Sequence, residues 1–152
     1  MIAQSLASLS IQSESEPASA LTLILGIEPH KSHEIGDLTW SGRNPGRSDA
    51  PAHRDFSSWT YDVTREQTPT DDETGLRSVR ELIRVFDPVA ETLRGLRPRY
   101  DYRIWWSGFS DSWQGGFVIE KDLFAGLARL DADIYGTAYL DAGDDDEEGP
   151  DD

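Results

Sequence analysis

The sequence predicts an α+β fold in which a mainly antiparallel sheet carries helices on one face, built from ferredoxin-like split β-α-β units. Several short segments alternate apolar and polar residues, which is the pattern of strands with one buried face. Other segments place apolar residues three or four positions apart, as in amphipathic helices. The order along the chain is strand, helix, strand, strand, helix pair, strand, strand, helix, strand. This mixed order favours one sheet with helices packed against it.

The first strand and the first helix are expected near the amino terminus. Apolar residues alternate with polar ones over residues 7–12, as in a half-buried strand. Residues 15–17 then combine a serine able to cap a helix with an early proline. A short apolar stripe follows and ends at Gly26. We therefore expect a helix that begins near Ser15 and stops at the glycine.

Two strands separated by a long loop are expected next. Residues 38–41 predict a weak strand, and residues 58–63 predict a stronger one because Trp59, Tyr61 and Val63 alternate with polar side chains. Residues 42–56 lack any periodic pattern and are rich in glycine, proline, arginine, serine and aspartate. Long loops of this kind often carry function.

The most regular helical pattern lies in the middle of the chain. Asp87 and Pro88 interrupt it, because proline lacks a backbone N–H and disfavours a helical conformation in the preceding residue. We expect two consecutive helices, with Asp87 capping the second and Pro88 in its first position. The apolar positions that define the common face are Leu76, Val79, Leu82, Ile83, Phe86, Val89, Ala90, Leu93 and Leu96.

The last part of the chain predicts a hairpin, a helix and a closing strand. Residues 100–106 alternate as a strand, and residues 108–113 contain several turn formers. Residues 114–119 are therefore expected to return as the partner strand of a hairpin. Residues 123–130 predict an amphipathic helix, and residues 132–139 predict the final strand.

Five short motifs lie at residues 25–29, 36–37, 86–89, 115–117 and 132–135. Together they resemble the bacterial family known as domain of unknown function 4279. Their order and spacing carry the resemblance, which extends over roughly residues 5–140. It implies a small bacterial α/β domain, and it brings neither an established activity nor catalytic residues.

The charge of the chain is strongly negative and unevenly distributed. Twenty-nine acidic residues against fourteen basic ones give a net charge of −15, which disfavours nucleic acid as a partner. Eight of the acidic residues follow Leu140, so residues 1–140 carry −7. Like charges at that density repel one another and bury no apolar surface. We expect a single α+β domain over residues 1–140 and a disordered acidic tail over residues 141–152.

The chain contains no cysteine, which excludes disulfides, thiolate metal sites and cysteine nucleophiles. We see no basic leader at the amino terminus and no apolar run long enough to cross a bilayer. These features predict a cytoplasmic protein that does not bind membranes.

Histidines and carboxylates gather in one segment that could be mistaken for a metal site. Gly26 and Pro29 break the helical geometry that would place them on one face, so we expect a solvent-facing loop without metal or other cofactor. His53 lies in the long loop, and no serine has the strand-turn-helix context of a nucleophile. We therefore expect no catalytic residues. The segment contains Glu28, His30, His33, Glu34 and Asp37.

The five tryptophans are the most informative side chains, because tryptophan is enriched at binding hot spots. Trp105 and Trp106 are adjacent on a predicted strand and must point to opposite faces of the sheet. We expect Trp106 to face the helices and Trp105 to lie on the other face. The candidate binding residues are Asp101, Arg103, Trp105, Asp111, Trp113, Tyr135 and Tyr139.

These observations favour a non-catalytic binding module that recognises another protein through an acidic face bearing tryptophan and tyrosine. An immunity protein that neutralises a basic toxin is one concrete form of this hypothesis. One alternative is a small-ligand-binding protein or enzyme with a pocket near the aromatic residues, using His30, His33, Asp37 or Asp111. Another is a structural homo-oligomer whose aromatic face joins two subunits.

Overall fold

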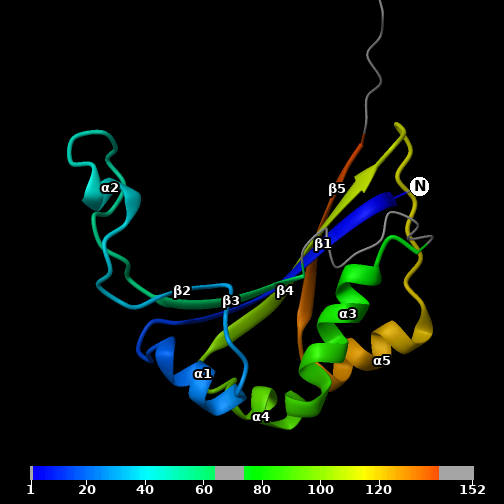
Figure 1. Cartoon of the computed structure of the whole chain (residues 1–152), viewed down its shortest axis with the longest axis horizontal. Coiled ribbons are helices and arrows are strands. Elements are labelled where there is room, and N and C mark those ends of the chain that lie inside the picture. Colours follow the sequence, from blue (N-terminus) through cyan, green and yellow to red (C-terminus); the bar gives the residue numbers. More distant parts are fainter. Residues whose placement is uncertain (1, 64–73, 141–152) are drawn as a thin grey trace, which may run out of the picture.

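A computed structural model describes residues 2–63 and 74–140 and shows a five-stranded sheet with helices packed on one face (Figure 1). The predicted acidic tail lies outside these residues. The strands are β1 (Ile2–Ser13), β2 (Lys31–His33), β3 (Ser57–Val63), β4 (Asp101–Ser110) and β5 (Asp133–Tyr139). The helices are α1 (Ser19–Leu25), α2 (Trp40–Arg43), α3 (Arg77–Phe86), the 3-10 helix η2 (Asp87–Val89), α4 (Ala90–Gly95) and α5 (Lys121–Leu130).

The strand order is β2-β3-β1-β4-β5, which places the amino-terminal strand at the centre of the sheet. β1 pairs antiparallel with both β3 and β4, so β3 and β4 run parallel to each other on either side of it. The chain passes from β3 to β4 through α3 and α4, which makes a split β-α-β unit. β5 then pairs parallel with β4 after α5. The predicted α+β class is therefore confirmed.

The core lies between the sheet and four of the helices, α1, α3, α4 and α5 (Figure 1). Alternate residues of the central strands point into it, among them Leu9 of β1 and Ile104 of β4, both fully buried. Leu82 and Phe86 of α3 are also fully buried. Figure 1 shows α2 standing apart, on the segment that connects β2 with β3. No helix of residues 2–63 and 74–140 packs over the central strands on the opposite face of the sheet.

The predicted interruption of the long helix is confirmed. α3 ends at Phe86, η2 contains Pro88, and α4 begins at Ala90. The predicted cap is wrong, because the N-cap position of α4 is held by Val89 and not by Asp87. Its Oδ1 instead accepts a hydrogen bond from Arg129 Nε at 2.7 Å, which ties this turn to α5.

The first helix begins later than predicted. Ser15 is not its cap, since α1 starts at Ser19 and Ala18 holds the capping position. The acceptors for the first backbone N–H groups come from Glu34, whose carboxylate oxygens lie 2.8 Å from Ala18 N and 2.7 Å from Ser19 N. The predicted stop is correct, because Gly26 adopts a left-handed conformation with φ of 66°.

The predicted strand at residues 38–41 is wrong. Thr39 caps α2 there, with its Oγ1 accepting a hydrogen bond from Gly42 N at 3.1 Å. Leu38 forms only an isolated bridge with His53. The additional strand of the sheet is β2 instead, which pairs with β3.

The predicted hairpin is also wrong. β4 continues to Ser110, and residues 114–119 form no strand. Their backbone bonds to other parts of the chain: Gly116 O accepts from Ile2 N at 3.3 Å, and Val118 N donates to Thr74 O at 2.9 Å. The place beside β4 that a hairpin partner would take is occupied by β5.

Among the helices of residues 2–63 and 74–140, none has both the length and the apolar character needed to cross a membrane.

Candidate functional site

The uncovered face of the sheet carries the most distinctive side chains of the protein. On β4 the outward residues are every second one from Asp101, because side chains alternate along a strand. The parallel register sets Trp105 beside Tyr135 and Phe109 beside Tyr139. Two neighbouring strands thus present four rings on one side. We call Trp105, Phe109, Tyr135 and Tyr139 the aromatic row.

The rings of the aromatic row contact one another in two pairs. The Trp105 and Tyr135 centroids are 5.2 Å apart, and the Phe109 and Tyr139 rings stack with centroids 5.1 Å apart and planes 14° from parallel. Trp105 is nevertheless 48% exposed and Tyr139 53% exposed. Cross-strand contacts therefore hold the rings in fixed positions while much of their surface stays in water.

The two adjacent tryptophans have opposite environments. Trp106 is 4% exposed, and its Nε1 donates a hydrogen bond to Gly75 O at 3.0 Å. Trp105 projects to the uncovered face with Tyr135. The expectation that Trp106 faces the helices and Trp105 faces away is therefore correct.

A charged group lies at one end of the aromatic row. The Arg103 guanidinium lies 5.0 Å from the centre of the Tyr135 ring and donates a hydrogen bond to the Asp101 carboxylate. This hydrogen bond raises the pKa of Arg103 above its ordinary value. Asp101 also pairs with Arg97 at 3.3 Å. The predicted residues Asp101, Arg103, Trp105, Tyr135 and Tyr139 thus share one surface.

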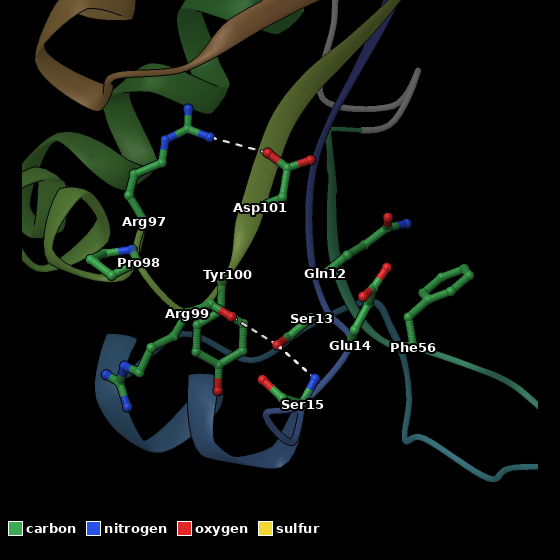
Figure 2. A pocket seen from close by; sticks show the side chains of 10 residues that line it. All are labelled: Gln12, Ser13, Glu14, Ser15, Phe56, Arg97, Pro98, Arg99, Tyr100 and Asp101. Carbon is green, nitrogen blue, oxygen red and sulfur yellow. Dashed lines mark hydrogen bonds and ion pairs between the residues drawn. The ribbon is translucent and has the colours of Figure 1, made fainter.

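A hollow of about 460 Å³ opens next to Asp101, where β1 ends and β4 begins (Figure 2). Most of its polar groups are engaged in internal bonds. Ser13 Oγ donates to Arg99 O at 2.8 Å and accepts from Ser15 N at 3.2 Å, as the dashed lines in Figure 2 show. Glu14 lines the same hollow with an exposed carboxylate side chain. Arg97 and Arg99 line the hollow too, so its charge is mixed, and Glu14 is the carboxylate that can accept a hydrogen bond from a partner.

Two predicted site residues lie away from the row. Trp113 and Asp111 follow the end of β4 in a bend, and both are exposed. Within the described residues Trp113 makes no ring contact with the aromatic row. Sequence reasoning missed Phe109, because the neighbouring glycine and serines placed it in a predicted turn. The unbroken alternation from Asp101 to Phe109 was the signal that could have found it.

The histidines and carboxylates of residues 28–37 make separate local contacts instead of forming one cluster. His30 Nδ1 accepts a hydrogen bond from Asp62 N at 3.0 Å, and its ring packs edge-on against Tyr61. Glu34 binds the start of α1, and Asp37 Oδ2 accepts from Glu34 N at 2.7 Å. Nowhere in the described ranges do three or more histidines and carboxylates gather in a way that could hold a metal ion.

Comparison with known proteins gives one finding. Residues 3–141 match the family described as "Domain of unknown function (DUF4279)". Searches among curated proteins and among solved structures returned no match.

Proposed function

The chain belongs to the DUF4279 family, a description that assigns no activity, and we propose from the uncovered sheet face that it is a non-catalytic module that binds another protein. The aromatic row carries this proposal. Three of its rings, those of Trp105, Tyr135 and Tyr139, are about half exposed. Rings that are held by their neighbours lose little conformational freedom on binding, which is characteristic of interface hot spots. A row along two strands offers a broad surface, whereas small molecules generally bind in concave pockets.

The charge of the chain supports a basic partner rather than a second copy. Two copies would each bring a net charge of −15, and their repulsion opposes association. Glu14 in the hollow that adjoins the row offers an exposed carboxylate to a lysine or arginine side chain of a partner. An immunity protein that neutralises a basic toxin has these properties, and it is the concrete form that we propose.

The test compares the variants Trp105→Ala and Leu23→Ala in the capture of a partner protein and in the kinetics of its binding. The full chain is immobilised and exposed to lysate of the native host, and the captured protein is then purified for kinetic measurements. We expect a basic protein, and we expect Trp105→Ala to weaken its binding by about 2 kcal/mol or more, roughly thirtyfold in Kd. The loss should appear mainly as faster dissociation, because the ring acts only at short range.

Leu23→Ala is the matched control. Leu23 is an apolar side chain of α1 that is 87% exposed on the helical side of the molecule. Its replacement should leave the dissociation rate unchanged. Capture that is indifferent to both Trp105→Ala and Tyr135→Ala would contradict the proposal. So would a purified chain that is a dimer and becomes monomeric on Trp105→Ala, since the row would then join two copies.

Deleting residues 141–152 should slow association with the same partner and leave dissociation nearly unchanged. The deletion removes eight negative charges, which act at long range on a basic protein. The difference between full and truncated chains should shrink as added salt brings the Debye length below about 10 Å. Association rates measured by surface plasmon resonance at several salt concentrations test this. Equal association rates at low salt would show that the tail does not attract the partner.

A further inference from the structure

A second feature of the uncovered face is a cavity of about 860 Å³ at the β2 and β3 end of the sheet. One wall comes from the outward side chains of these strands. The other wall comes from the segment that connects β2 with β3 and carries α2, which Figure 1 shows standing out from this end of the sheet. The lining residues used below are Lys31, His33, Arg43, Arg54, Ser58 and Thr60.

The cavity is basic in a protein that is strongly acidic. Lys31, Arg43 and Arg54 line it, and the carboxylate among its lining residues is Asp37. Asp37 Oδ2 already accepts a hydrogen bond from Glu34 N at 2.7 Å. Lys31 lies 3.6 Å from Asp62, while its side chain is 79% exposed. The local charge is therefore opposite to the net charge of −15.

The two arginines of the cavity form no ion pair with any carboxylate of residues 2–63 and 74–140. Other arginines of the fold are paired: Arg80 with Asp122 at 2.7 Å and Arg129 with Asp87 at 2.7 Å. Arg43 uses one nitrogen, Nη1, to donate to Leu38 O at 2.7 Å. Most N–H donors of both guanidinium groups therefore stay available to an anion. Within the described residues they are unpaired, in a chain that has 29 acidic residues against 14 basic ones.

Neutral polar groups complete the lining. Ser58 and Thr60 contribute hydroxyl groups from the outward side of β3. His33 lines the same cavity, and its Nε2 is buried without a hydrogen-bond partner in the described part of the chain. Burial, and then the nearby Arg54, lower the pKa of His33, so the imidazole is neutral at neutral pH. A buried nitrogen without a hydrogen-bond partner is unfavourable, and a bound group can reach it only if the His33 ring turns towards the cavity.

We propose that this cavity binds a small molecule through an anionic oxygen group, a phosphate or a carboxylate, held by Arg43 and Arg54. The planar guanidinium fork presents parallel N–H donors that match two oxygens of either group. The serine and threonine hydroxyls can donate to the remaining oxygens. The volume lies within the usual range for sites that take small organic ligands. This site is separate from the aromatic row and does not depend on the protein-binding proposal.

The test titrates the full chain with inorganic phosphate and, separately, with succinate, by isothermal titration calorimetry in low-salt buffer. We expect at least one of these probes to bind with one-to-one stoichiometry, although the net charge of the protein repels anions in general. Binding of phosphate alone or of succinate alone identifies the group that the site accepts. Sodium chloride at the same ionic strength should release no comparable heat.

Arg43→Gln and Arg54→Gln should each weaken the binding roughly tenfold or more, because each removes charge-assisted hydrogen bonds. Arg47→Gln is the matched control, since Arg47 is an exposed arginine of the same segment and does not line the cavity. Arg54→Lys keeps the charge without the fork and should fall between wild type and Arg54→Gln. Unchanged far-UV circular dichroism shows that each variant is folded.

Binding of neither probe would overturn the proposal. Equal weakening by Arg47→Gln and Arg54→Gln would also overturn it, because the effect would then come from general charge. Trp105→Ala should leave phosphate and succinate binding unchanged, which separates this site from the proposed protein interface.

Discussion

Leu82→Asp is expected to unfold the domain at room temperature. Leu82 is fully buried on α3, between Val79 and Phe86, and this helix packs against β1 and β3. The substitution removes a large apolar side chain and places a carboxyl group where it has no water. The combined cost is about 4–5 kcal/mol or more, which is comparable with the total stability of many small domains.

Urea unfolding followed by circular dichroism measures this effect, with Arg84→Ala as the control on the same helix. The Arg84 side chain is 71% exposed, and it pairs with Glu81 one turn earlier. Exposed pairs of this kind contribute little to stability, so the control should stay close to wild type. Comparable losses in both variants would mean that the buried face of α3 is assigned wrongly.

The periodic segments were predictable because the pattern that forms them is local. Leu82 and Phe86 repeat at helical spacing, and Asp87-Pro88 can interrupt the helix in only a few ways. Strand pairing is not local in this sense. The alternation of residues 132–139 predicts a strand, but it does not say that β5 would lie parallel beside β4. The turn formers after Ser107 favoured a hairpin. In the structure the chain instead passes from β4 through α5, and β5 then pairs with β4.

The start of α1 shows the same limit. Ser15 and Pro17 match a local capping pattern, yet the acceptors come from Glu34, which is distant in sequence. A contact of this kind depends on how β2 returns towards the helix, and no short window of sequence contains it.

The candidate site was predictable where it follows strand alternation. Trp105 and Tyr135 could be assigned to one face because each lies on a strand with a clear period of two. The basic cavity could not be found in this way. Arg43 and Arg54 lie in a segment without a periodic pattern, and the fold brings them opposite His33 on β2.

The second large effect is expected at Trp106, the buried partner of the exposed Trp105. Trp106→Ala should lower the free energy of unfolding by about 3–5 kcal/mol. The variant loses a large ring that is 4% exposed, and it leaves Gly75 O without the hydrogen bond from Nε1. Denaturant unfolding measures this loss. A change below about 1 kcal/mol would show that the ring does not belong to the core.

Gly108 makes the test at Trp106 specific. A Cβ atom added at Gly108 would lie 2.5 Å from Trp106 Cζ2 and 2.6 Å from Cη2, so Gly108→Ala should cost about 1–3 kcal/mol through overpacking. Gly95→Ala is the control, because nothing lies within 4 Å of a Cβ at that position, and it should be neutral or slightly stabilising.

In a chain that already carries Trp106→Ala, the clash with the indole no longer exists. Gly108→Ala should then cost at least about 1 kcal/mol less than it does alone, which a double-mutant cycle measures directly. Strict additivity of the two substitutions would mean that the glycine is needed for a reason other than room for the tryptophan ring.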